Sequence, residues 1–164
     1  MNTPVYDFLI QYAERDPVRL HMPGHKGRFG APALQRATTL DLTEITGADS
    51  LFEAEGILAE SERNAASLYG TAYTFYSCGG STLCIQTMLL LMKQQGRAVL
   101  AARNVHRAFL NTCVLLDLPV QWIYPRESDG ILSGTYDLAD FEAALQQQTR
   151  PACVYVTSPD YLGR

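Results

Sequence analysis

The sequence predicts an α/β protein whose helices cover both faces of a parallel β-sheet. From residue 57 onward, segments with helical spacing alternate with short strand-like segments. Two of the helical segments are followed by a glycine, Gly70 and Gly96, as is usual where helices end. The chain has 164 residues, 47% of them hydrophobic, enough for a domain that buries roughly 70% of its unfolded surface. This alternation is typical of the three-layer αβα architecture.

The expected elements follow from apolar spacing and from helix start and stop signals. Pro4 begins a first helix over residues 3–14. The later helices are expected at residues 57–69, 81–95, 106–116 and 137–147, and the strands at residues 73–77, 98–102, 120–124 and 152–157. Between Leu83 and Met92 the helix 81–95 is apolar on nearly every face, so we expect it to be buried.

A long segment between the first two helices shows little regular period. Residues 17–56 are rich in glycine and proline. Such long irregular segments are uncommon in compact domains and are more often functional than idle. We therefore divide the chain into an N-terminal helix with a loop segment (residues 1–56) and an α/β part (residues 57–164).

A serine–threonine pair follows the first expected strand, in the run Gly79-Gly-Ser-Thr82. Free N–H groups at a helix start, two hydroxyl groups and glycines that allow close approach favour an anion such as phosphate. Ser and Thr are also common N-caps, so an ordinary helix start is the alternative for Ser81 and Thr82. Neither G-x-x-x-x-G-K-[ST] nor G-x-G-x-x-G is present, so no standard nucleotide site is indicated.

Two further polar residues directly follow expected strands. His106 comes after residues 98–102, and Ser158 comes after residues 152–157. Because ligands of parallel α/β sheets bind beyond the carboxyl ends of the strands, we expect both residues to meet the serine–threonine pair at one rim. The alternatives are that His106 is a polar helix-start residue and that Ser158 only ends a strand.

The segment His21-Met-Pro-Gly-His-Lys-Gly27 lies in the long loop. His21 and His25 have the i, i+4 spacing of many zinc sites, but the Pro-Gly pair between them excludes the helix such sites use, so we expect no metal. A turn that holds His25 and Lys26 near an anionic group is the favoured interpretation. Four widely spaced cysteines without a C-x-x-C pair indicate buried free thiols, not disulfides.

Charge and hydropathy argue against nucleic-acid and membrane partners. Thirteen basic and 17 acidic residues leave a formal net charge of −4 without a basic stripe. The longest apolar stretch, residues 88–92, is too short to span a bilayer, and the N-terminus lacks the layout of a signal peptide. We expect a cytoplasmic protein.

The motifs and their order resemble the pyridoxal-phosphate-dependent ornithine/lysine/arginine decarboxylases of fold type I, in particular the shorter bacterial members. The resemblance covers essentially the whole chain. It rests on residues 21–27, Asp41-Leu-Thr-Glu44, residues 47–56, Gly80-Ser-Thr82, Arg103-Asn-Val-His106 and Thr157-Ser-Pro159.

The resemblance implies a cofactor site at the rim. Gly80, Ser81 and Thr82 would hold the phosphate of pyridoxal 5′-phosphate. His106 would stack on the pyridine ring, and Ser158 would lie near the ring's substituents. The implied reaction decarboxylates a basic amino acid (lysine, arginine or ornithine) to an amine and CO₂.

The resemblance also implies a dimer or larger assembly with sites at the interface. The loop that contains His21, His25 and Lys26 would lie close to the active site and the subunit contact. Two positions depart from the family pattern: Gly79 stands where Asn is usual, and Asp160 stands where Thr is common.

Family members carry a Schiff-base lysine, and a carboxylate at the pyridine nitrogen, downstream of the Thr-Ser-Pro turn. The only lysines of this sequence, Lys26 and Lys93, do not match that position, so we expect the chain alone to be inactive. A non-catalytic pyridoxal-phosphate-binding or regulatory protomer, or another α/β enzyme with a phosphate ligand, remain alternatives.

Fold type I implies a seven-stranded sheet, of which this sequence supplies an incomplete part of about four strands. From that topology we expect only the strands 98–102 and 120–124 to be direct neighbours, and the strand 73–77 to lack its partner. Unpaired backbone and uncovered apolar faces would then result. We therefore expect no stable native-like monomer.

Overall fold

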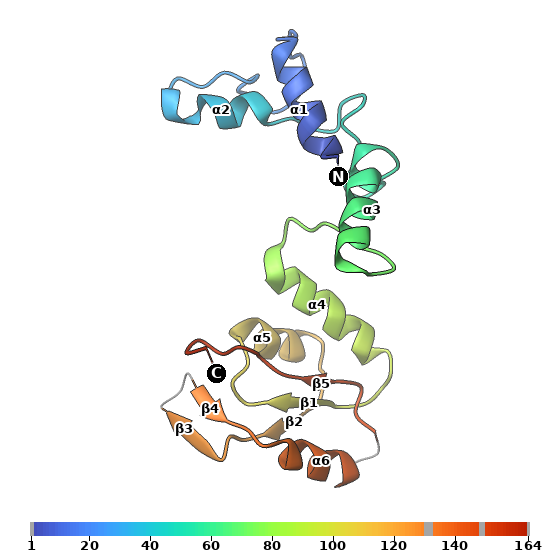
Figure 1. Cartoon of the computed structure of the whole chain (residues 1–164), viewed down its shortest axis with the longest axis vertical. Coiled ribbons are helices and arrows are strands. Elements are labelled where there is room, and N and C mark those ends of the chain that lie inside the picture. Colours follow the sequence, from blue (N-terminus) through green and yellow to red (C-terminus); the bar gives the residue numbers. More distant parts are fainter. Residues whose placement is uncertain (1, 130–132, 148–149, 164) are drawn as a thin grey trace. The chain divides into compact units, whose positions relative to one another are not determined.

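The computed structural model describes residues 2–129, 133–147 and 150–163. The chain forms two compact units, Met1–Tyr76 and Ser77–Arg164, which are described separately below. Figure 1 labels the helices and strands of both.

The first unit is helical within the described residues. α1 (Pro4–Glu14) packs against both α2 (Pro32–Leu40) and α3 (Ile57–Tyr69). The bounds of α1 and α3 match the sequence prediction, and Gly70 ends α3 with a left-handed φ of 65°. α2 was not predicted. None of its residues is buried, and it lies in the glycine- and proline-rich segment 17–56, which the sequence analysis took as irregular, although Pro32 at its start is a helix signal.

Residues 73–77 do not form the expected strand. No described strand pairs with them. Tyr73 and Phe75 are mostly exposed and stack on each other, with ring centroids 6.4 Å apart. A strand needs a neighbour for its backbone N–H and C=O groups. The sequence analysis expected residues 73–77 to lack a neighbouring strand. The lack of such a neighbour among the described strands accounts for the irregular backbone here.

The second unit is built on a parallel sheet. Its strands are β1 (Val99–Ala102), β2 (Val120–Ile123) and β5 (Val154–Tyr155), in the spatial order β2-β1-β5. α4 (Gly80–Lys93) and α5 (Arg107–Leu115) lie on one face, and α6 (Leu138–Gln147) lies on the other (Figure 1). The α/β class and the three layers are confirmed, with three described parallel strands in place of about four.

The pairing of β5 corrects the expected topology. β5 lies directly beside β1, with Leu100 opposite Val154 and Ala101 opposite Tyr155, so β1 has neighbours on both sides. A hydrogen bond from Leu100 N to Cys153 O (3.0 Å) ties the two together. Every residue of β1 is buried, and a buried strand requires partners at both edges for its backbone groups.

A hairpin that was not predicted follows β2. β3 (Glu127–Asp129) and β4 (Ser133–Thr135) pair antiparallel, with Ser128 opposite Gly134. The dipeptide Asp129-Gly130 is a hairpin signal that the sequence analysis overlooked.

The core of the second unit lies between the sheet and the α4–α5 layer. Phe109 of α5 is fully buried and contacts Tyr155 and Trp122, with ring centroids 4.3 Å and 6.0 Å away. Leu89 of α4 and Cys113 of α5 belong to the same cluster. Side chains from both helices thus join the apolar residues of the strands.

The expected full burial of α4 is wrong for this structure. Leu89 is buried, but Leu83, Leu90 and Leu91 are 43%, 49% and 54% exposed. α5 and the sheet cover one side of α4, whereas its apolar residues occur on nearly all sides. The uncovered apolar side chains therefore remain in contact with solvent.

The cysteine prediction holds in part. Cys113 is buried, and burial together with the nearby Cys153 raises the pKa of its thiol to about 11, which makes it unreactive. Cys78 and Cys84 are exposed, contrary to expectation, because they lie beside and within the uncovered start of α4.

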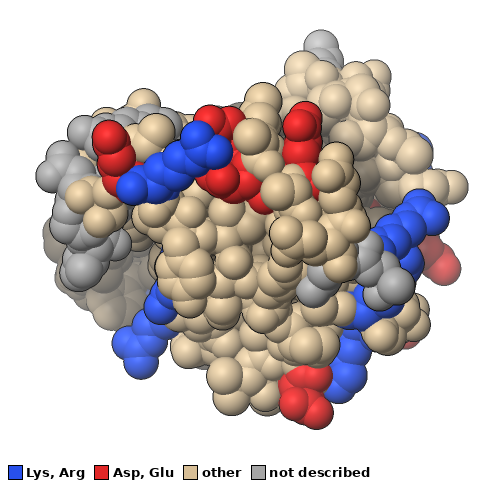
Figure 2. Space-filling view, turned by 90° about the horizontal axis from the view of Figure 1, so that it is seen from below, with Lys and Arg blue, Asp and Glu red and all other residues tan. Residues whose placement is uncertain are grey.

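Acidic and basic side chains are interspersed in the view of Figure 2, where some lie side by side and no large patch of one sign is seen. Across the described ranges, no helix combines the length and the apolar character needed to cross a membrane.

Candidate active site at the start of helix α4

The glycine pair at the start of α4 has the backbone geometry of an anion-binding nest. Gly79 lies near the right-handed region (φ −85°, ψ 6°), and Gly80 is left-handed (φ 63°). A right-handed residue followed by a left-handed one turns consecutive backbone N–H groups toward a common point, where an anion can bind. No neighbouring heavy atom lies within 4 Å of the position that a Cβ of Gly80 would occupy, so the concavity is open.

Ser81 and Thr82 do not cap α4. The N-cap position is Gly79, and no side chain accepts a hydrogen bond from the first turn. Within the described part of the chain, neither hydroxyl has a hydrogen-bond partner, and both side chains are exposed. The ordinary N-cap interpretation is therefore wrong for this pair. Free N–H groups, the positive end of the helix dipole and two available hydroxyls remain for a ligand.

The close approach of Leu83 explains why residue 79 is a glycine. A Cβ at this position would lie 2.6 Å from Cβ of Leu83, closer than real side chains approach. Its N–H donates to Oγ of Ser77 (3.1 Å). The asparagine expected from the family resemblance could not fit here unless Leu83 moved.

His106 is the N-cap of α5. Its Nδ1 accepts a hydrogen bond from the backbone N–H of Ala108 (3.1 Å), so the capping ring is the neutral tautomer with its proton on Nε2. The polar helix-start interpretation is thus correct for His106. Capping uses an edge of the exposed ring, which leaves its faces available for stacking.

The predicted cofactor residues lie on one side of the sheet. β1 and β5 are parallel neighbours, so the residues that follow them, His106 and Ser158, lie at the same edge. Figure 1 shows the start of α4, the start of α5 and the end of β5 on this side. Ser158 is exposed, and the nearby Asp160 accepts a hydrogen bond through Oδ1 from Leu162 N (2.9 Å). Any contact of these residues with a cofactor stays a prediction.

Asn104 is a polar residue at this edge to which the sequence analysis gave no separate role. Its backbone N–H donates to the hydroxyl of Tyr136 (3.1 Å), while its side-chain Oδ1 is buried without a hydrogen-bond partner among the described residues. A buried acceptor without a partner is uncommon and invites a donor from water or a ligand. Asn104 lies in the motif Arg103-Asn-Val-His106, and this motif was the sequence signal that could have identified it.

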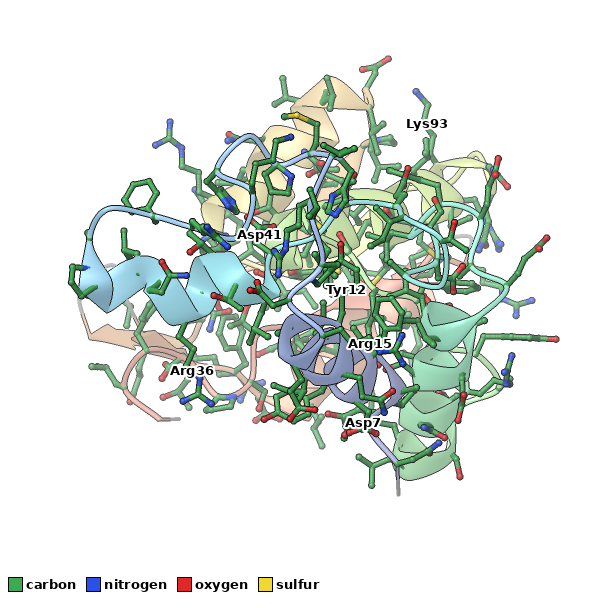
Figure 3. The ribbon with its side chains drawn as sticks, turned by 90° about the horizontal axis from the view of Figure 1, so that it is seen from above. Asp7, Tyr12, Arg15, Arg36, Asp41 and Lys93 are labelled. Atoms are coloured by element: carbon green, nitrogen blue, oxygen red, sulfur yellow. The ribbon has the colours of Figure 1, made fainter. Side chains whose placement is uncertain are left out.

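The loop of residues 21–27 belongs to the first unit and bonds mainly to its own surroundings. His21 Nε2 lies 2.7 Å from the Tyr12 hydroxyl, and His21 Nδ1 lies 2.5 Å from the carbonyl of Met22. Lys26 Nζ donates to the carbonyl of His21 (2.6 Å). Figure 3 labels Tyr12 on α1 and Asp41 after α2, the two elements that hold this loop.

His25 is held at both ring nitrogens. Nδ1 accepts a hydrogen bond from Gly27 N (3.1 Å), so the proton is on Nε2, which donates to Oδ2 of Asp41 (3.1 Å). This ring is therefore engaged in positioning the loop. In the described ranges, no three His, Cys, Asp or Glu side chains lie close enough together to hold a metal ion.

Comparison with known proteins relates the chain to one family. Residues 3–161 match the model of the Orn/Lys/Arg decarboxylase major domain. An arginine decarboxylase of Halalkalibacterium halodurans is 30% identical over 98% of this chain and 34% of its own length. Lysine decarboxylase LdcA of Pseudomonas aeruginosa is 23% identical over 84% of this chain and 20% of its own length. An inducible ornithine decarboxylase of Lactobacillus sp. is 26% identical over 85% of this chain and 21% of its own length.

The chain thus spans about a third or less of the length of these relatives. The family match, in contrast, extends over almost all of the chain. The chain therefore belongs to the Orn/Lys/Arg decarboxylase family, whose major domain it matches over residues 3–161.

Proposed function

We propose that the chain binds pyridoxal 5′-phosphate through the phosphate, at Gly80, Ser81 and Thr82, as part of a decarboxylase of basic amino acids. The observation that carries this proposal is the right-handed and left-handed glycine pair that opens an uncapped helix. Relatives named arginine, lysine and ornithine decarboxylase support the substrate class. We further propose a cytoplasmic homodimer or larger assembly.

Each residue of the site has a distinct task in this proposal. The N–H groups after Gly80 and the hydroxyls of Ser81 and Thr82 bind the phosphate oxygens. His106, held by the Ala108 N–H, presents a ring face on which the pyridine ring stacks, and Ser158 donates to a ring substituent. When bound, the cofactor supplies an electron sink for the substrate carbon that loses CO₂.

Each lysine of the chain already donates to a backbone carbonyl within its own unit. Lys93 ends α4, roughly 20 Å along the helix from Gly80 at 1.5 Å per residue, and it donates to the carbonyl of Leu116. Lys26 belongs to the first unit and donates to His21 O. We therefore propose that the chain alone binds the cofactor without decarboxylating amino acids.

A fluorescence or absorbance titration with pyridoxal 5′-phosphate tests the binding proposal. Thr82→Val should weaken binding about tenfold, because a hydrogen bond to a charged group contributes roughly 1.5–3 kcal/mol. Thr87→Val is the matched control, since this hydroxyl lies on the same helix and already donates to Leu83 O (3.0 Å). Equal effects of the two substitutions, or no binding by the parent chain, would contradict the proposal.

Activity and covalent binding are tested separately. We expect no amine product from lysine, arginine or ornithine with the purified chain and added cofactor. An absorbance band of a covalent lysine adduct that disappears in Lys26→Met or Lys93→Met would show that one of these lysines does reach the cofactor.

A further inference from the structure

Arg19 is a buried cation to which the proposed function gives no role. The residue is only 8% exposed. Within the described ranges, no carboxylate lies within ion-pair distance of its guanidinium, since the ion pairs found there involve other residues. Burial of a charge is costly unless polar groups replace the lost water. The contacts of Arg19 show which polar groups compensate for the burial of its charge.

One side of the guanidinium caps the end of α2. Nη2 donates to Thr39 O (2.6 Å), and Nη1 lies 3.5 Å from both Thr38 O and Asp41 O. Carbonyls at a helix C-terminus lack partners within the helix and carry partial negative charge. α2 has no basic residue in its own last turn, so Arg19 supplies the cation from outside the helix.

The guanidinium also contacts the end of the 21–27 loop and α1. A Cβ at Gly27 would lie 2.5 Å from Cζ of Arg19, so glycine is required for this approach, and its φ of 75° favours glycine as well. Cζ lies 5.1 Å from the centroid of the Tyr12 ring, which in turn bonds His21.

Arg19 thus bridges the two residues that hold the His25 ring. Gly27, which donates to His25 Nδ1, packs against the guanidinium. Asp41, which accepts from His25 Nε2, is contacted by Arg19 through its backbone carbonyl.

The residues around Arg19 show an inverted polarity pattern. Val18, Leu20 and Met22 are 86%, 91% and 64% exposed, while Arg19 between the first two is buried. In an alternating segment, a shift by one residue would bury the apolar side chains and expose the cation. A departure from the apolar-inside rule that has no local benefit is typical of functional sites.

We infer that Arg19 is the positioning residue of the 21–27 loop: it clamps Gly27 to the end of α2 and so fixes the orientation and tautomer of His25. The inference rests on the proposed function only in placing this loop near an active site. The clamp itself is a property of the chain without ligand.

Hydrogen exchange of the full chain tests the clamp. Arg19→Met keeps the apolar stem but removes the donors, so exchange at Gly27 and Arg28 should become roughly tenfold faster, as expected for a lost local constraint. The amides of Glu55 and Gly56, held by Asp49 in the same unit, should not change. Arg36→Met on the exposed side of α2 (Figure 3) is the matched control and should leave both regions unchanged.

A second variant approaches the same contact from the other side. Gly27→Ala should displace the guanidinium and reproduce the local exchange pattern of Arg19→Met, while Arg19→Lys should not restore protection, because one ammonium group cannot replace the guanidinium fork. In nitrogen-15 spectra, His25 should lose its fixed Nε2–H tautomer in Arg19→Met and Gly27→Ala but keep it in Arg36→Met.

Three outcomes would overturn the inference: unchanged exchange at Gly27 in Arg19→Met, equal acceleration at the amides held by Asp49, or full protection in Arg19→Lys. Binding of pyridoxal 5′-phosphate to the same samples tests the proposed function separately. A chain that binds no cofactor would refute that function, while the exchange data would still decide the clamp.

Discussion

Asp49 organises the loop before α3 through a single carboxylate. It accepts hydrogen bonds from the backbone N–H groups of Ser50, Glu55, Gly56 and Leu58, at 2.9–3.1 Å. Partial burial raises the pKa of this carboxyl, but the four N–H donors outweigh that effect and lower the pKa to about 2. The same carboxylate caps α3, whose N-cap Gly56 has no side chain for this purpose.

The lowered pKa of Asp49 makes the loop acid-sensitive. An unfolded aspartate has a pKa of about 3.9, so the stabilisation is complete above that pH and is lost as the pH falls toward 2. We expect the amides of Gly56 and Leu58 to lose exchange protection over this range. Asp49→Asn should lower their protection above about pH 4, where the parent carboxylate is charged, and the difference should vanish toward pH 2, whereas Glu53→Gln, an exposed change in the same loop, should leave the protection unchanged. Equal pH profiles for parent and Asp49→Asn would contradict this role.

The cap that His106 provides predicts a different ranking of substitutions. Asparagine is a good N-cap and alanine is not, so His106→Asn should preserve α5 while His106→Ala should lower the free energy of unfolding by about 1 kcal/mol. Both variants lose the imidazole ring, so both should bind pyridoxal 5′-phosphate more weakly. Urea unfolding and cofactor titration of the two variants separate capping from stacking. A less stable His106→Asn variant would argue against the cap.

At the scale of elements, the two sides of α4 should respond differently to substitution. Leu89→Ala removes a fully buried side chain and should cost about 2–5 kcal/mol. Leu91→Ala, on the uncovered side, should have little effect. Fluorescence of Trp122, the sole tryptophan of the chain, follows this core during urea unfolding because its ring contacts Phe109. Similar urea midpoints for both variants would mean that another surface covers α4.

The hairpin and α6 are joined by one arginine. Arg126 makes two hydrogen bonds to Asp140, both 2.9 Å, and one to Asp137, 2.6 Å. The hydrogen bond from Arg126 lowers the pKa of Asp140, and in return that of Arg126 is raised. Arg126→Lys should loosen the hairpin at low salt, because lysine lacks the planar fork. The difference from the parent should shrink at high salt, where exposed charges are screened. Proteolysis of the hairpin at two salt concentrations measures this, and a difference that does not depend on salt would contradict it.

For the whole molecule, the exposed apolar surface predicts self-association. Tyr73, Phe75, Leu90 and Leu91 are exposed, and β5 is described with a strand partner on one side. Uncovered apolar patches and open sheet edges favour association over a stable monomer. We expect light scattering to show a mass that rises with concentration, and Leu91→Glu to reduce it. A monomer with a sharp, cooperative thermal transition would refute this expectation.

The sequence by itself determined the elements whose signals are local. α1, α3, α5 and β2 lie where apolar spacing, Pro4 and Gly70 indicated, because side chains three or four apart, or two apart, already define one face of a helix or strand. The glycines and hydroxyl residues at the start of α4 were recognisable for the same reason, since they lie within a few residues of one another, and their binding of an anion stays a prediction.

Only the tertiary structure decided what joins residues far apart in the chain. It paired β5 with β1 and stabilised the end of α2 through a buried arginine that lies 19 and 20 residues from its hydrogen-bond partners there. No local period encodes such contacts, because strand pairing and the satisfaction of a buried charge depend on which groups the fold brings together. The same reason kept the role of Arg19 out of reach of the sequence.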